Sequence, residues 1–294
     1  MSLHTEDTRE GASATTVAGA PARAKRRRGP HRWTLWQRVT LGVAGVIVLG
    51  IVMELVSRFG FANPDYVPPL TAIIGRIGEF LFDPASVTGN FYAQVAATMV
   101  GFLTGLGIAV VLGIGLGVLF GLWEVSYRSS RTVIELLRPI PPVALIPVAI
   151  LLLGSGFNMK TSIVVFACIW PIMFNALYGV RNVDPMLKDM ARSFGRTRGD
   201  VVRSIVFPSA LPLMWTGIRV ASTIALIVII TTELIVGGSV GIGGIFATAR
   251  AQGNDVLTFY AAIIVSGVLG LIVNLALAAV ERRFFAWSKT TKEA

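Results

Sequence analysis

The sequence from Val180 to Pro212 reads VRNVDPMLKDMARSFGRTRGDVVRSIVFPSALP, and it is the one long polar and basic interruption between two strongly apolar blocks of the chain. Asp184 followed by Pro185 is a typical start of a helix, and Gly195 is a typical end. The sequence therefore predicts a short helix over residues 184–195, then a second basic segment that closes at Pro208.

The predicted short helix carries one apolar stripe. Its members recur at the spacing of a single helix face and are Leu187, Met190, Ala191 and Phe194. A helix this short is marginal alone in water, so the stripe needs a partner. The spacing leaves two partners open, which are the apolar segments of the same chain and a groove on another subunit.

Composition places the rest of the chain in a membrane. The 294 residues are 54% hydrophobic and 14% charged, with a mean hydropathy of +0.71, whereas soluble domains average about 45–50% apolar and about 25% charged residues. The net charge of +10 is also compatible with nucleic-acid binding. However, the basic residues stand beside apolar runs, which favours the inner leaflet of a membrane over nucleic acid. The fold class that follows is all-α, a polytopic membrane protein.

Six apolar segments have the length of about 20 residues that a bilayer core of about 30 Å requires. We expect spans at 39–56, 93–122, 132–153, 161–180, 213–236 and 256–280. Between the first two spans, residues 70–81 carry apolar residues at helical spacing and predict an interfacial helix outside the bilayer.

The distribution of basic residues predicts the orientation. With the N-terminus inside, 21 of the 26 Lys and Arg residues are cytoplasmic: eight before the first span, three between 128 and 138, six between 181 and 203, and four after 280. Because basic residues gather on the cytoplasmic side, we expect both termini in the cytoplasm and a multi-pass protein of a bacterial plasma membrane. The predicted domains are a disordered basic cytoplasmic tail at 1–32, a transmembrane domain at 33–288 that contains the polar loop 181–211, and a cytoplasmic tail at 289–294.

Glycines and prolines mark two of the predicted spans. In the second span Gly101 and Gly105 are four residues apart, as are Gly113, Gly117 and Gly121. This spacing allows neighbouring helices to approach closely, either in plain tight packing or in a helix that slides. The third span contains Pro141, Pro142 and Pro147. Because proline lacks a backbone donor, this span is either kinked or broken around a pathway.

Few charged residues fall inside the spans. Glu233 follows Thr232 in the fifth span. It is either part of a transport pathway, because ionisable groups inside a membrane are usually functional, or an interfacial residue near the outer surface. Arg219 either extends to the membrane surface or binds an anion. The candidate pathway residues are Pro141, Pro142, Thr232 and Glu233.

The residue types argue against catalysis by this chain. Cys168 is the single cysteine, within an apolar run, and both histidines lie in the N-terminal tail, so we expect no metal site. Residues 154–161, GSGFNMKT, look like a phosphate loop, but Met159 stands where the second glycine is required. We expect no bound cofactor and no enzymatic activity of its own. An ion-coupled secondary transporter is an alternative, but no clear inverted repeat supports it.

The polar loop resembles a motif of ABC importer permeases. Asp189-Met190-Ala191, three residues, Gly195, nine residues and Ile205-Val206-Phe207-Pro208 are similar to the E-A-A-x3-G-x9-I-x-L-P loop of that family. Asp189 replaces the glutamate, and Met190 and Phe207 depart from Ala and Leu. Stretches at 138–147, 170–175, 179–185, 211–219 and 281–287 resemble the nitrate/sulfonate/taurine branch, so the resemblance covers residues 40–288. Leu152 and Leu153 replace an aromatic pair that this branch often has, which leaves the substrate open.

The resemblance implies a fold and a set of partners. The fold is that of a type I ABC importer permease with about six transmembrane helices. The partners are a second permease copy, most simply in a homodimer, a cytoplasmic ATPase dimer that binds ATP and Mg²⁺, and an external binding protein. This binding protein would deliver a small anionic solute such as a sulfonate, taurine or a nitrate-like compound, and the permease would move it inward by alternating access.

The same resemblance assigns the helix at 184–195 as a coupling helix in a groove of the ATPase. The residues that it assigns to ATPase coupling are Asp184, Leu187, Asp189, Met190, Ala191, Phe194, Gly195, Ile205 and Pro208.

Overall fold

The computed structural model describes residues 35–59, 66–87, 90–237, 240–253 and 255–284. The predicted tails at 1–32 and 289–294 lie outside these ranges. The described part of the chain divides into two units between residues 48 and 49.

Within the described ranges every regular element is a helix, which confirms the predicted fold class. In chain order the helices are α1 (Leu35–Arg58), α2 (Leu70–Phe82), α3 (Phe91–Leu122), α4 (Glu124–Leu137), α5 (Ile146–Leu153), α6 (Phe157–Arg181), α7 (Pro185–Ser193), α8 (Arg198–Val201), α9 (Phe207–Val236), α10 (Ile242–Ala251) and α11 (Val256–Phe284). Short 3-10 turns lie at Pro84–Ser86 and Pro142–Leu145, and a π-helical turn lies at Val202–Val206.

The first unit contains the N-terminal part of α1. Its apolar side chains are exposed, among them Leu41, Val46 and Ile47, as expected of a helix that faces lipid along its length. The stretch Thr40–Arg58 is long and apolar enough to cross a membrane. This agrees with the span predicted at 39–56.

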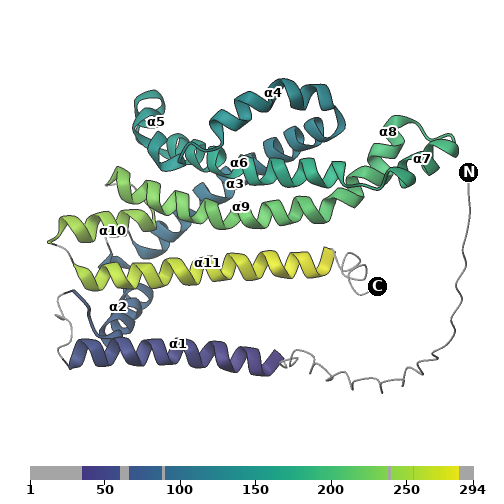
Figure 1. Cartoon of the computed structure of the whole chain (residues 1–294). Coiled ribbons are helices and arrows are strands. Elements are labelled where there is room, and N and C mark those ends of the chain that lie inside the picture. Colours follow the sequence, from purple (N-terminus) through teal and green to yellow (C-terminus); the bar gives the residue numbers. More distant parts are fainter. Residues whose placement is uncertain (1–34, 60–65, 88–89, 238–239, 254, 285–294) are drawn as a thin grey trace, which may run out of the picture. The chain divides into compact units, whose positions relative to one another are not determined.

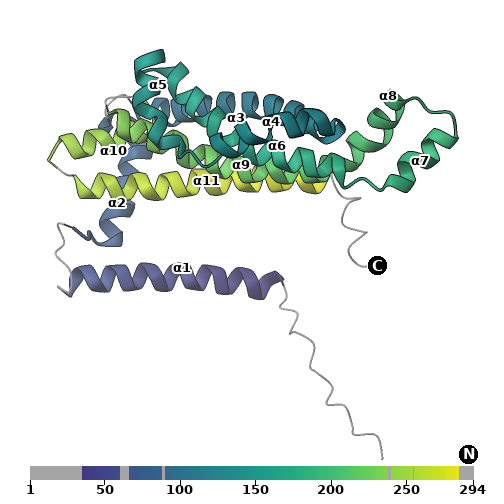
Figure 2. The ribbon, with the colours of Figure 1, turned by 45° about the horizontal axis from the view of Figure 1, so that its top comes forward.

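The core of the second unit is formed by α3, α6 and α9, which lie side by side (Figure 1 and Figure 2). Glycines on α3 allow the close approach to α6, because a Cβ added at Gly105, Gly113 or Gly117 would come within 2.8 Å of α6 side chains. Gly107 and Gly115, which fall outside the four-residue spacing, have no neighbouring atom within 4 Å of such a Cβ. The glycine spacing therefore marks tight helix packing.

The third predicted span is broken rather than kinked. α4 and the segment Pro142–Leu153 are long and apolar enough to span only when taken together, and they are bent by 82° at the break. Pro139, Pro141 and Pro142 lie at this break. Proline lacks an N–H donor and disfavours helical backbone at the residue before it, so three prolines end α4. Among the described residues, five helices are long and apolar enough to cross a membrane, or six if the broken pair is one span.

Two boundaries correct the sequence analysis. α6 begins at Phe157 rather than at residue 161, so Lys160 lies inside a helix and not in an outer loop. Pro208 was expected to close the polar loop, but it lies in the first turn of α9, and helical backbone runs through it from Arg198. The π-helical turn before it spaces the hydrogen bonds more widely, which accommodates a proline that has no donor.

The connections of the second unit gather at two opposite ends. α7 and α8 lie at one end, beyond α6 and α9, and α2 and α10 lie at the other (Figure 1). α2 confirms the helix predicted at 70–81. Its Ile73 and Phe80 are buried in a cluster with Ile242 of α10, whereas Ile74 and Leu81 are exposed.

Candidate functional site

Helix α7 starts at the residues that the sequence predicted. The Asp184 carboxylate accepts a hydrogen bond from the Met186 N–H at 2.8 Å, and Pro185 occupies the first turn. This cap satisfies a backbone donor that has no partner within the helix. The carboxylate also places negative charge at the positive end of the helix dipole.

Helix α7 ends at Ser193, and the chain turns two residues later at Gly195, which adopts a φ of +75°. This left-handed conformation costs glycine little and other residues more. The Gly195 N–H donates to the Arg192 carbonyl at 2.9 Å, and the Arg196 N–H donates to the Ala191 carbonyl at 3.1 Å. These two bonds close the helix and turn the chain toward α8.

The apolar stripe of α7 is exposed. Leu187, Met190 and Phe194 have exposed fractions of 46%, 50% and 82%. Ala191 is half-buried and packs against a buried cluster, mostly of valines, in the same unit. The spacing left two partners open for this stripe. The chain's own apolar segments contact only its edge, and the centre of the stripe stays exposed. Asp189 is exposed and pairs with Arg192 at 3.2 Å.

The rest of the predicted coupling set lies on the segment after α7. Thr197 caps α8 in a reciprocal arrangement with Asp200, which fixes the direction of the chain toward α9. Ile205 is half-buried against the same valine cluster, and Pro208 is exposed. The structure thus brings Ala191 and Ile205 to one apolar cluster and leaves the α7 stripe on the outside.

Glu233 lies inside the helix bundle, not at the surface. Its side chain is 1% exposed. The carboxylate accepts hydrogen bonds from Thr98 of α3 at 2.8 Å and from the Lys160 ammonium of α6 at 3.4 Å. The ammonium also donates to the Val240 carbonyl at 2.6 Å. A buried ion pair of this kind needs such additional hydrogen bonds to offset its desolvation.

The same cluster holds the start of α10. Three consecutive backbone N–H groups donate to side-chain oxygens of α3 and α9, and the pairs are Gly241 with Gln94, Ile242 with Thr98, and Gly243 with Glu233. A Cβ at Gly241 would lie 2.1 Å from the Glu233 carboxylate, so glycine is required there. The sequence analysis identified only Glu233 of this cluster, because it considered acidic residues alone. The polar residues within the apolar helices α3 and α6 were the signal that could have revealed the rest.

The other candidate pathway residues are dispersed. Thr232 is 0% exposed, and its hydroxyl donates to the Val228 carbonyl at 2.7 Å. Pro141 and Pro142 lie at the break before α5. The structure does not bring these prolines together with Thr232 and Glu233.

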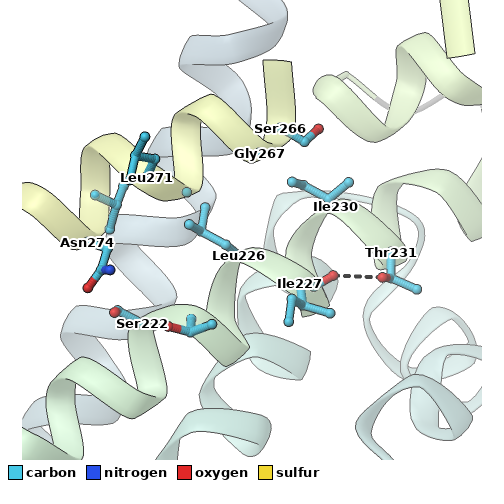
Figure 3. Close-up of a pocket in the computed structure, with 12 residues that line it drawn as sticks. Ser222, Leu226, Ile227, Ile230, Thr231, Ser266, Gly267, Leu271 and Asn274 are labelled. Carbon is cyan, nitrogen blue, oxygen red and sulfur yellow. Dashed lines mark hydrogen bonds between the residues drawn. The ribbon is translucent and has the colours of Figure 1, made fainter. Parts of the chain in front are cut away.

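A groove of about 490 Å³ runs between α9 and α11. In Figure 3, Ser222 and Thr231 of α9 and Ser266 and Asn274 of α11 lie along it, among apolar side chains. The hydroxyls of Ser222, Thr231 and Ser266 each donate to a carbonyl three or four residues earlier in the same helix. Their oxygens therefore keep the capacity to accept a hydrogen bond. Sequence reasoning missed this groove, although small and hydroxylated residues recur on both spans.

Arg219 is held within the chain next to this groove. Its guanidinium pairs with Glu281 at 3.0 Å and donates to the Asn274 side-chain oxygen at 3.2 Å. Cys168 is buried, and its thiol donates to the Ala221 carbonyl at 3.3 Å, which agrees with a packing role. Among the described residues, no three His, Cys, Asp or Glu side chains are grouped to hold a metal ion.

Comparison with known proteins places the chain among transport proteins. A family model described as "Binding-protein-dependent transport system inner membrane component" matches residues 109–286. This match contains α7, α8 and the helices that surround the groove between α9 and α11.

Relatives match over most of the chain. The taurine transport system permease protein TauC of Escherichia coli (strain K12) is 28% identical over 262 residues, which cover 89% of this chain and 94% of that protein. The nitrate import permease protein NrtB of Synechocystis sp. is 26% identical and covers 91% and 96%. The bicarbonate transport system permease protein CmpB of Synechococcus elongatus is 28% identical and covers 90% and 96%.

A solved structure shares the fold. A chain of the MetNI methionine ABC transporter in inward facing conformations has a TM-score of 0.57 at 18% identity, and the match covers 65% of this chain and 94% of that one. The chain described here is therefore a multi-pass membrane protein that belongs to the binding-protein-dependent transport system inner membrane components, the permeases of ABC importers.

Proposed function

We propose that this permease moves a small anionic solute inward by alternating access, driven by a separate cytoplasmic ATPase that docks on α7. ATP and Mg²⁺ would bind to that ATPase. An external binding protein would deliver the solute. Both termini, α7 and α8 would lie in the cytoplasm of a bacterial cell, as the distribution of basic residues indicates.

The observation that carries the proposal is the exposed stripe of α7. A capped helix of nine residues presents Leu187 and Met190 away from its own chain, and Phe194, the residue after the helix, is exposed next to them. Exposed apolar residues at this spacing are the anchors by which a helix enters a groove on another protein. A rigid connection to α9 would let movement of the docked ATPase reach the membrane helices.

The identity of the solute rests on the relatives. The matched permeases carry the names of taurine, nitrate and bicarbonate systems, and all three solutes are small and bear a negatively charged group. An anion of this size is the substrate class that we assign to this chain.

A second copy of the chain would cover the groove between α9 and α11. The most apolar window of α11 has none of its residues buried, while Ser266 and Asn274 line the groove on that helix. Polar side chains inside a membrane usually face protein or a water-filled cavity rather than lipid. A homodimer with the solute pathway along this face meets that requirement.

The alternative, an ion-coupled secondary transporter, is not favoured. The family and the relatives are ABC importer permeases. In addition, the carboxylate of Glu233 is engaged by Thr98, Lys160 and the backbone of Gly243, so it serves the start of α10.

The docking is tested by co-purifying the chain with the ATPase encoded nearest to it. Met190→Asp and Phe194→Asp place a carboxylate in the centre of the stripe. An unpaired charge in an apolar groove costs several kcal/mol, so we expect retention of the ATPase to fall by at least about tenfold. Ser209→Asp is the matched control, because it adds the same charge to an exposed position outside α7, in the first turn of α9.

Retention of the ATPase by Met190→Asp at the level of wild type would contradict the docking role of α7. Loss of the ATPase from Ser209→Asp to the same extent would show that any added negative charge is sufficient. Size-exclusion profiles in detergent confirm that each variant is folded.

A further inference from the structure

A second groove, of about 560 Å³, lies behind α7. It is bounded by the end of α3, by α7, and by α8 with the π-helical turn that follows. The stripe residues Met190 and Phe194 do not line it. An ATPase docked on the stripe would therefore leave this groove accessible from the membrane side.

The rim of the groove is strongly basic. Lys188, Arg192, Arg198 and Arg203 line it, and none of the residues that line it is acidic. Of these four, only Arg192 has a carboxylate partner, Asp189, within the described part of the chain. The groove therefore carries an excess of positive charge that is not neutralised by ion pairs within the described ranges.

Among the described residues, the carboxylate on α8 forms no ion pair with the basic side chains that line the groove. Asp200 is held by the hydroxyl and the backbone N–H of Thr197 at 2.7 and 3.2 Å. Both bonds are accepted by the same oxygen, Oδ2, which thus serves the cap of α8. Three of the basic side chains remain available for an anionic ligand.

The wall of the groove is apolar and lies where α3 ends. Leu122, Val202 and Val206 line it together with Trp123, which is 58% exposed. α3 is an apolar helix of 32 residues that ends at Leu122. Tryptophan is enriched at the boundary between lipid and water. We therefore expect the groove, which both basic and apolar residues line, to lie at the depth of lipid headgroups.

We propose that this groove binds the phosphate of an anionic phospholipid from the cytoplasmic leaflet. The proposal rests on the cytoplasmic placement of α7 given under Proposed function. Guanidinium groups bind phosphate oxygens in pairs, and basic pockets on the cytoplasmic side of membrane helices bind anionic headgroups. A free phosphate would use the rim alone, whereas a phospholipid also covers the apolar wall with its glycerol and acyl chains.

Binding is measured on the full chain purified in detergent, by native mass spectrometry with added phosphatidylglycerol or phosphatidylcholine. Each basic side chain near an anionic headgroup contributes a factor of about five in affinity, so Arg198→Gln/Arg203→Gln should weaken phosphatidylglycerol binding by about 25-fold. The control Arg128→Gln/Arg196→Gln removes two exposed arginines that do not line the groove, and it should bind as wild type does.

Three results would overturn the proposal. These are equal binding of phosphatidylcholine, equal losses in the variant and the control, and displacement of bound phosphatidylglycerol by inorganic phosphate alone. A second measurement does not depend on the variants: lipid extracted from the wild-type protein should be enriched in anionic phospholipid relative to the membrane from which it came. Absence of that enrichment also counts against the site.

The proposed lipid site and the proposed ATPase site can be tested independently of each other. Met190→Asp should lose the ATPase and keep the lipid, whereas Arg198→Gln/Arg203→Gln should lose the lipid and keep the ATPase in detergent. If the arginine variant instead loses the ATPase and retains the lipid, the groove belongs to the docking surface. In that case the lipid proposal fails while the proposed function stands.

Discussion

At the scale of single residues, Gly117 has no room for a methyl group. Its Cβ would lie 2.5 Å from the Ala176 Cβ and 2.5 Å from the Met173 carbonyl oxygen. We expect Gly117→Ala to destabilise the protein by about 1–3 kcal/mol, because α3 must move away from α6. Gly115→Ala is the matched change on the same helix, and it should leave stability unchanged or raise it by up to about 1 kcal/mol. Equal melting temperatures in one detergent would contradict this packing.

The pair of Lys160 and Glu233 gives a second prediction at this scale. Lys160→Met leaves the buried carboxylate without a cation, and we expect a loss of about 3–5 kcal/mol. Adding Glu233→Gln removes the remaining charge and keeps an acceptor for the Gly243 N–H, so the double variant should recover part of that loss. Thermal unfolding of the wild type, Lys160→Met, Glu233→Gln and the double variant measures the coupling. A double variant no more stable than Lys160→Met would show that the charges do not act as a pair.

At the scale of elements, Asp255 joins α2 to α11. It lies just before α11, and its carboxylate accepts hydrogen bonds from the Thr258 N–H and hydroxyl at 3.1 and 2.7 Å, as a helix cap does. The Arg76 guanidinium of α2 pairs with it at 2.8 Å. Burial alone raises the pKa of the Asp255 carboxyl, but the bonds from Thr258 and Arg76 outweigh burial and hold this pKa below its usual value.

This lowered pKa makes the link between α2 and α11 sensitive to acid. Because the pKa of Asp255 is lower in the folded than in the unfolded state, its stabilisation is complete above the unfolded pKa and is lost as pH falls through the folded pKa. The window lies below about pH 4. Asn also caps helices, so Asp255→Asn should flatten the fall in melting temperature in this window and cost about 0.5–1 kcal/mol at pH 7. Identical acid profiles of wild type and variant would contradict this role. Asp83→Asn, at an exposed position, is the control.

At the scale of the whole molecule, the arrangement of the two ends across the membrane can be tested with single cysteines. Cys168 is the one cysteine of the chain and is 0% exposed, so introduced cysteines can be labelled selectively. Phe82 at the end of α2 is 90% exposed, and Ser129 on α4 is exposed. A membrane-impermeant maleimide added to spheroplasts should label Phe82→Cys, and it should label Ser129→Cys only after permeabilisation. Labelling of both from outside would contradict the predicted orientation.

The amino-acid sequence by itself determined the features of this protein that depend on neighbouring residues. Apolar length defined the spans, because about 20 apolar residues are needed to cross a bilayer whatever the helix packs against. Asp184 and Gly195 defined α7, because caps act on backbone groups within one turn. The four-residue glycine spacing and the loop motif are equally local, so the fold class and the family could be recognised before the structure.

Only the tertiary structure decided which distant residues meet. Lys160 reaches Glu233 across 73 positions of the chain, and Gln94 reaches Gly241 across 147. The groove between α9 and α11 and the basic groove behind α7 arise in the same way. Side chains that are far apart in sequence are placed together by the packing of whole helices, and that packing minimises the free energy of the entire bundle. No local pattern encodes it, and for this reason the candidate sites other than α7 became visible only in three dimensions.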